Sequence, residues 1–119
     1  MIMLNKKIFL ISVIFLAGCT HATKKIYYWD KYPSTVYQYY HDKKSTPDDQ
    51  IATLLVSMEK SQAKGQKTPP GLHAHLGLLY ANIGHADLAF EEFNNEKRLF
   101  PESAAFMDFL MKKDKGSLK

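Results

Sequence analysis

The sequence contains a single cysteine, Cys19, in 119 residues, so no disulfide can form within the chain. No segment alternates between apolar and polar residues as the strands of a sheet do. The fold must therefore depend on apolar packing between helices. We predict an all-α domain, which at this length is one compact unit.

Reactive groups are also scarce. The sequence has no glycine-rich phosphate loop and no arrangement of a nucleophile with a base. His73 and His75 are two residues apart, which puts them on different sides of a helix, so we predict no metal site. Acidic pairs such as Asp48–Asp49 are typical of a helix start. We therefore predict that the protein is not an enzyme and uses no cofactor.

The first 18 residues have the composition of a secretory signal peptide. A basic patch at residues 6–7 precedes an apolar run over residues 8–17, and small residues follow. The run is about half the length of a membrane-spanning helix, which needs roughly twenty residues. We predict that residues 1–18 are the signal peptide and that residues 19–25 form a lipidated polar tether.

The segment Leu16–Cys19, with the sequence LAGC, resembles the lipobox of bacterial lipoproteins, in which the cysteine is acylated after cleavage. The resemblance implies a stable lipid anchor on Cys19, because two or more acyl chains hold a protein firmly on a membrane. The residue after the cysteine is Thr20 rather than an acidic residue. This resembles lipoproteins that are sorted to the outer membrane, with the domain on the periplasmic face. The alternative is a chance cysteine after an apolar run.

The charge of the chain is weakly basic. There are 16 basic and 12 acidic residues, a net charge of +4. Loss of residues 1–18 removes Lys6 and Lys7 and no acid, which leaves 14 basic residues and a net charge of +2. This charge is small and dispersed, so we predict no nucleic-acid partner.

Four apolar patterns with helical spacing follow residue 46. The first begins at Thr46, a good N-cap, and Pro47 suits the first helical position. The predicted helices occupy residues 47–64, 70–83, 86–100 and 102–112. With one more helix near the N-terminus, we predict four to five helices over residues 26–112 and a polar tail at 113–119.

Each predicted helix has a face that should turn toward the core. The residues on these faces are Ile51, Leu54, Leu55, Met58, Leu72, Leu76, Leu79, Tyr80, Ile83, Ala89, Phe90, Phe93, Phe106, Phe109 and Leu110. The last three belong to the final helix, which we expect to cover the C-terminal end of the domain.

Residues 73–101 fit the spacing of one helical hairpin, the tetratricopeptide repeat. The repeat positions are occupied by His73, Leu76, Gly77, Tyr80, Ala89, Phe93 and Pro101. Gly77 and Ala89 are small where two antiparallel helices should approach closely. His73 replaces the usual aromatic residue, and Glu96 stands where a small residue is common. We predict a tetratricopeptide-like hairpin with flanking helices, the alternative being an unrelated helical hairpin.

A repeat of this kind presents a concave surface to partners. By its usual geometry, the residues lining that surface would be Ala74, Leu78 and Ala81, with Asn82 at the edge. Asn82 could there bond the backbone of a bound peptide. The same residues could equally pack against the N-terminal helices.

Residues 27–40 hold six of the seven tyrosines and the only tryptophan. A helix beginning after Pro33 is predicted to carry on its inner face Val36, Tyr37 and Tyr40, approached by Trp29 and Tyr32. We favour burial of Trp29 in the core or end cap, because large aromatics stabilise a small domain. The alternatives are an exposed surface that binds protein or glycan, and a belt at the membrane interface.

Three segments, residues 27–40, 68–103 and 104–113, resemble a family of small Gram-negative lipoproteins that contain a domain of unknown function. The family is similar to tetratricopeptide-type helical proteins. Its members are often encoded beside a lipoprotein resembling the curli export pore. The resemblance implies a role in an envelope assembly and supplies no catalytic residue.

These observations predict a lipoprotein anchored in the outer membrane, on its periplasmic face. We expect it to act as a non-catalytic interaction or assembly module, accessory to an envelope export or pore complex. Its partners would be the membrane, through the lipid, and another envelope protein. The alternative is a glycan or peptidoglycan binder that uses Trp29 and the neighbouring tyrosines as stacking surfaces. The sequence does not predict the oligomeric state.

Overall fold

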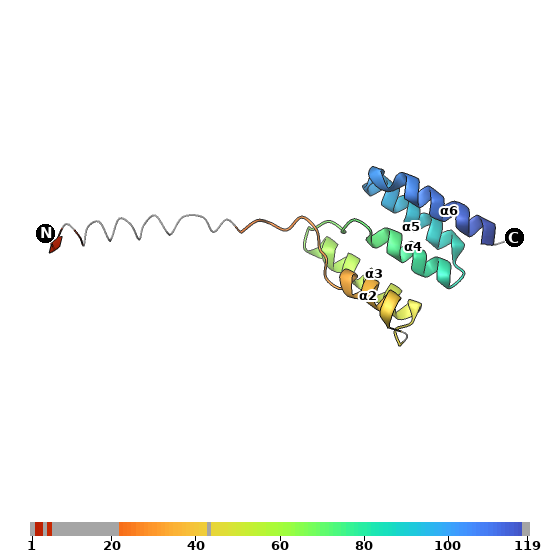
Figure 1. The fold of residues 1–119 in the computed structure, drawn as a ribbon, viewed down its shortest axis with the longest axis horizontal. Coiled ribbons are helices and arrows are strands. Elements are labelled where there is room, and N and C mark those ends of the chain that lie inside the picture. Colours follow the sequence, from red (N-terminus) through yellow and green to blue (C-terminus); the bar gives the residue numbers. More distant parts are fainter. Residues whose placement is uncertain (1, 4, 6–21, 43, 118–119) are drawn as a thin grey trace.

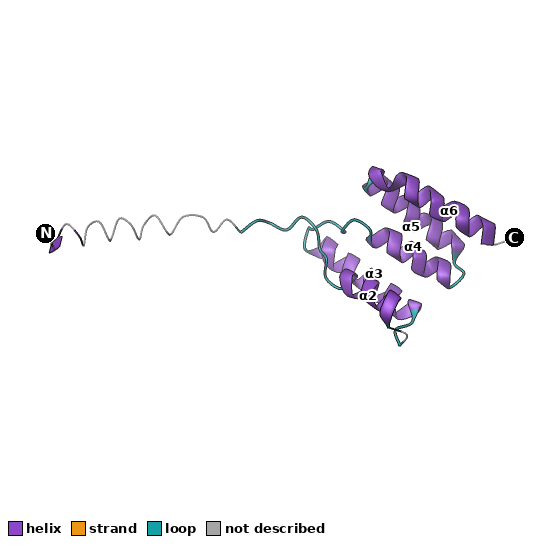
Figure 2. Ribbon diagram, viewed as in Figure 1, coloured by secondary structure: helices purple, strands orange, loops and turns teal. Residues whose placement is uncertain are grey.

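The computed structural model describes residues 2–3, 5, 22–42 and 44–117. From residue 22 onward, the described residues form five α-helices and one 3-10 turn (Figure 1). None of these residues belongs to a strand (Figure 2), although a single backbone bridge joins Tyr27 to Lys67. The prediction of an all-α fold with four to five helices is confirmed.

The helices form two hairpins followed by a single helix (Figure 1). Their bounds are α2 (Tyr32–His41), α3 (Pro47–Ala63), α4 (Leu72–Asn82), α5 (Ala86–Leu99), the 3-10 turn η1 (Pro101–Ser103) and α6 (Ala104–Ser117). Each helix packs against the next one along the chain. Because every connection reverses the chain, α2, α4 and α6 run in one direction, and α3 and α5 run in the other (Figure 1).

The start of α3 follows directly from its sequence. The hydroxyl of Thr46 accepts a hydrogen bond from the backbone N–H of Asp49 at 3.2 Å, and the Asp49 carboxylate accepts one from the N–H of Thr46 at 3.4 Å. This reciprocal pair is a capping box, and Pro47 occupies the first turn, where no N–H is needed. The predicted N-cap of this helix is confirmed.

Two clusters of buried side chains form the core. The first lies between α3 and α4 and contains Ile51, Leu54, Leu72, Leu76 and Leu79. The second lies between α5 and α6 and contains Ala89, Phe93 and Met107. The side chain of Tyr80 packs against both clusters and links them. The inner faces predicted for α4 and α5 are therefore confirmed.

Gly77 allows the side chain of Phe93 to pack directly on α4. A Cβ atom added at Gly77 would lie 2.5 Å from Cε1 of Phe93, closer than two carbon atoms can approach. Phe93 is almost fully buried, and Ala89, one turn before it on α5, is buried completely. The predicted close contact of these two helices at Gly77 is confirmed.

The inner face predicted for α6 is wrong for two of its three residues. Phe106 and Phe109 are 58% and 59% exposed, whereas Met107 is buried. Leu110 and Met111 pack partly buried beside Met107. The spacing of Met107, Leu110 and Met111 forms a helical stripe of its own, and the flexible methionine side chains fill the space against α5.

The inner face predicted for α2 is also wrong. Tyr37 and Tyr40 are 63% and 68% exposed. Thr35 is buried instead, and Tyr32 and Tyr39 pack against the first core cluster. The three inner residues are three and four positions apart, so they share one side of the helix. The buried face is displaced by one position along the helix from the predicted one, and α2 begins at Tyr32 rather than after Pro33.

Candidate binding groove

The parallel helices α2, α4 and α6 border an apolar groove of about 320 Å³. Its walls are Tyr32, Val36 and Tyr40 of α2 on one side, and Ser103, Phe106 and Met107 around the start of α6 on the other. Its floor is formed by Gly71, Ala74, His75 and Leu78 around α4, with Glu96 of α5. Glu96 is the only carboxylate among these lining residues, and no lysine or arginine is present.

The structure brings together two of the four residues predicted to line a concave surface. Ala74 and Leu78 lie in the floor of the groove. Ala81 is partly buried against the second core cluster and is not among the groove residues. Asn82 is exposed outside the groove, where its Nδ2 donates a hydrogen bond to the hydroxyl of Tyr39 at 3.0 Å. The groove thus follows the first two turns of α4 rather than its end.

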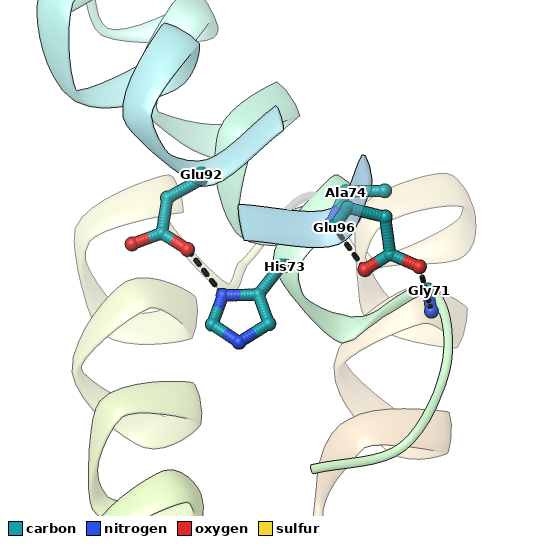
Figure 3. Close-up of polar contacts among 5 residues, drawn as sticks. All are labelled: Gly71, His73, Ala74, Glu92 and Glu96. Carbon is teal, nitrogen blue, oxygen red and sulfur yellow. Dashed lines mark hydrogen bonds and ion pairs between the residues drawn. The ribbon is translucent and has the colours of Figure 1, made fainter. Parts of the chain in front are cut away.

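A carboxylate from α5 caps the start of α4 (Figure 3). The N-cap residue of α4 is Gly71, which has no side chain to accept a hydrogen bond. Glu96 accepts one from the N–H of Gly71 at 2.7 Å and another from the N–H of Ala74 at 3.3 Å. These are the two groups that a capping box would satisfy from within the helix, and the negative charge is favourable at a helix N-terminus.

A second carboxylate of α5 holds the same end of α4 (Figure 3). The Nδ1 of His73 donates a hydrogen bond to Oε2 of Glu92 at 2.5 Å, and both side chains are largely buried. His73 and Glu96 were the two departures from the repeat pattern. In this fold both bind α4 to α5, which fixes the floor of the groove relative to the rest of the domain.

His75, in the floor of the groove, is buried. The rings of Tyr32 and Tyr39 lie 6.2 Å and 5.2 Å from its imidazole. Its Nε2 is buried and has no hydrogen-bond partner among the described residues. Burial lowers the pKa of His75 to about 4, so the ring is neutral at pH 7. Burial also raises the pKa of Tyr32, as do the nearby charges of Glu96 and Tyr40.

The expected burial of Trp29 is wrong, because 46% of the residue is exposed. Asp30 follows it with a φ of +33°, and the Asp30 carboxylate accepts a hydrogen bond from the Ser57 hydroxyl at 2.7 Å. This contact fixes a turn before α2. The Trp29 ring then stacks on Tyr32, with centroids 6.1 Å apart, and Tyr32 takes the position next to the core.

A second hollow, of about 400 Å³, lies beside the bridge between Tyr27 and Lys67. Its lining residues are Tyr27, Lys67, Thr68, Leu99, Phe100 and Glu102. The ring of Tyr27 lies 6.3 Å from that of Phe100 and 6.2 Å from that of Trp29. The aromatic surface predicted at Trp29 and Tyr32 therefore extends to Phe100, which is distant in sequence.

Cys19, the predicted lipidation site, lies outside the described residues. Within the described part of the chain, no helix is both long and apolar enough to cross a membrane. Among the same residues, no group of three or more histidine, cysteine or acidic side chains could hold a metal ion.

The fold and the groove define a small helical protein with an apolar surface between parallel helices. Over residues 26–110, the chain matches the family described as Domain of unknown function (DUF4810), and it belongs to that family. No curated protein and no solved structure matches the chain.

Sequence reasoning missed three features of the site: the capping role of Glu96, and the groove positions of Tyr40 and Phe106. The sequence did contain a clue to the capping role of Glu96. Gly71 leaves α4 without an N-cap side chain, and Glu96 occupies a position of the repeat where a small residue is common. No comparable clue distinguishes Tyr40 from Tyr37. Which of them borders the groove depends on the rotation of α2.

Proposed function

We propose that this protein is a lipid-anchored, tetratricopeptide-like module that binds another envelope protein in the groove between α2, α4 and α6. The observation that carries the proposal is the apolar lining of that groove, in which Ala74 and Leu78 form the floor. In a helical repeat, the first helices of successive hairpins line the concave surface. The alternating directions of α2 to α6 support this assignment.

The chemistry of the groove indicates what kind of partner it binds. Glu96 is 3% exposed and both of its oxygens accept hydrogen bonds from α4, so it offers little surface to a cationic ligand. The volume of about 320 Å³ is at the lower end of the range for sites that enclose a small molecule, about 300–1,000 Å³. We therefore propose that the groove takes a few apolar side chains from a segment of a partner protein, such as one face of an amphipathic helix.

The anchor is the second part of the proposal. The LAGC segment ending at Cys19 supports acylation, and a lipid would hold the domain at the periplasmic face of the outer membrane. Wild-type protein should then incorporate labelled fatty acid and fractionate with membranes, and Cys19→Ala should do neither. Equal labelling of both proteins would contradict the lipoprotein assignment.

Partner binding is tested with two exposed tyrosines of the same helix. Tyr40 lines the groove and Tyr37 does not. After chemical crosslinking in intact envelopes, the protein is purified and the bound proteins are identified. Tyr40→Ala should lose a partner that wild type and Tyr37→Ala both retain. Retention of every partner by Tyr40→Ala would contradict the groove as the binding site.

The exposure of Trp29 favours a second candidate function, glycan binding along the row of rings from Phe100 to Tyr32. Aromatic faces can stack on the apolar faces of sugar rings, and Lys67 and Glu102 could bond hydroxyl groups. Trp29 is the only tryptophan, so its fluorescence reports on this surface alone. Quenching by peptidoglycan fragments that is lost in a Tyr27→Ala variant would favour the glycan function. An unchanged spectrum would exclude it.

A further inference from the structure

A stripe of four exposed residues runs from η1 along α6. In α6, Phe106, Phe109 and Lys113 are separated by three and four positions, which places them along one side of the helix, and Glu102 lies four positions before Phe106 in the adjoining turn η1. Phe106 and Phe109 are 58% and 59% exposed, and their rings lie parallel within 15°, with centroids 6.4 Å apart. The stripe therefore has an apolar centre, an acid at one end and a base at the other.

Nothing in the described part of the chain covers this stripe. Among the described elements, α6 packs against α5 and η1, whereas α2 and α4 each pair with the helix after them. The described chain also gives Glu102 and Lys113 no hydrogen bond or ion pair. Exposed aromatic pairs of this kind mark an interaction surface, because a soluble protein seldom leaves such a patch in water.

We infer that the stripe binds the same stripe of a second copy, with the two α6 helices antiparallel. A twofold axis passing between Phe106 and Phe109 places Phe106 of one copy against Phe109 of the other. The same axis places Glu102 against Lys113 at both ends. The surface is thus complementary to itself, as the interface of a twofold dimer must be.

The charges select the antiparallel orientation. In a parallel pair, Glu102 would face Glu102 and Lys113 would face Lys113, and like charges repel. The dipoles of two parallel helices would also be unfavourably aligned. In the antiparallel pair, each end of the stripe gains an opposite charge. Exposed ion pairs add little affinity, so the aromatic contact stabilises the dimer and the charges set its orientation.

The interface is small. A standard protein interface buries about 1,200–2,000 Å² of accessible surface, and two helices of this length bury less. The dimer should therefore be weak and dependent on concentration. Anchoring in one membrane would raise the effective concentration of the copies, as a tether does. The dimer surface shares Phe106 with the wall of the groove, whereas Phe109 is not a groove residue, so substitutions at Phe109 test the dimer without changing the groove lining.

A zero-length carbodiimide crosslinker tests the register on the full-length protein in detergent, without any partner. It joins a carboxylate directly to an amine in contact with it. Within one chain, Glu102 and Lys113 are separated by about 16 Å of helix, so they can be joined only between two copies. We expect a dimer band that contains the Glu102–Lys113 linked peptide.

Three sets of variants complete the test. Glu102→Gln and Lys113→Gln should each lose that linked peptide, whereas Glu91→Gln, an exposed acid on α5, should keep it. Charge reversal by Glu102→Lys alone should lower the dimer fraction in sedimentation, and adding Lys113→Glu should restore it. Phe109→Ser should abolish the dimer with unchanged helical circular dichroism, and Tyr37→Ser, at a similarly exposed aromatic on α2, should not.

A monomer at every concentration, or a dimer linked elsewhere, would overturn the inference. Loss of dimer in Phe109→Ser together with retained partner capture would separate this surface from the groove. Loss of partner capture in Tyr40→Ala with an intact dimer would show that the groove is not needed for the dimer. Each proposal can therefore fail without the other.

Discussion

Replacing Glu96 tests the cap that one carboxylate of α5 provides for α4. Its two oxygens accept hydrogen bonds from the backbone N–H groups of Gly71 and Ala74, and the residue is 3% exposed. No side chain of α4 can take over, because the N-cap is a glycine. Gly71 has a φ of +91°, and a Cβ atom there would lie 2.5 Å from the hydroxyl of Tyr32, so a residue with a capping side chain would be strained at this position.

The expected cost follows from the two hydrogen bonds. Glu96→Gln keeps the shape of the side chain but turns an NH₂ group toward one of the two N–H groups. One hydrogen bond to a charged group is lost, which costs about 1.5–3 kcal/mol. Glu96→Ala leaves both N–H groups without an acceptor and opens a cavity, for a cost of about 3–5 kcal/mol. A domain of this size has a total stability of about 5–15 kcal/mol, so the alanine variant should be close to unfolding.

Urea unfolding of a lipid-free form beginning at residue 22, followed by circular dichroism, measures these costs. Glu91→Gln is the matched control, because Glu91 is exposed on the same helix and should change stability by less than about 0.5 kcal/mol. Hydrogen exchange adds a local readout, since the amides of Gly71 and Ala74 should exchange faster in Glu96→Gln. Equal stability of Glu96→Gln and wild type, with unchanged exchange at both amides, would refute the reasoning.

Three further changes test other contacts. Gly77→Ala should cost about 1–3 kcal/mol in the same unfolding assay, because its Cβ would overlap the ring of Phe93, and a wild-type midpoint would mean that the helices are not packed this closely. The pKa of His75 is about 4 in the fold and 6.5 unfolded, so below pH 6.5 the unfolded chain binds a proton that the fold does not. The free energy of unfolding should therefore fall as the pH is lowered from 6.5 to 4, by at most about 3 kcal/mol and by less where water screens the ring. His75→Phe should reduce this pH dependence of stability. Trp29→Ala should cost about 1–2 kcal/mol, since Trp29 is half exposed and keeps two ring contacts, and a loss of 3 kcal/mol or more would indicate burial.

The central hairpin could be predicted from the sequence because it has neighbours on both sides. α4 packs against α3 and α5, so its apolar residues leave little choice of inner face. Gly84 follows α4 with a positive φ, and Pro101, which has no backbone N–H, follows α5. Both effects end a helix regardless of what packs against it. Such signals are readable without knowledge of the rest of the fold.

The terminal helices were harder to predict because each presents two possible faces. In α6, Phe106 and Phe109 form one stripe, and Met107 with Leu110 and Met111 forms another. Periodicity fits both equally well, and the more apolar-looking stripe is the exposed one. Only the shape of the surface on α5 decides between them, and that shape is absent from the local sequence.

Contacts between distant segments explain the remaining differences. The cap that Glu96 gives to Gly71 joins residues of different helices, and the turn at Asp30 depends on Ser57 of α3. Neither pair follows a local spacing rule. The exposure of Trp29 is a consequence of that turn, so it could not be predicted from the aromatic composition of residues 27–40.

Site-specific photocrosslinking tests the central claim, that the groove between α2, α4 and α6 holds a partner. A photoreactive residue replaces either Tyr40 or Tyr37, which are 68% and 63% exposed on the same helix. Irradiation of intact cells should link position 40, which lines the groove, to a discrete protein and leave position 37 unlinked. Linkage at position 37 alone, or the same product from both positions, would contradict the account.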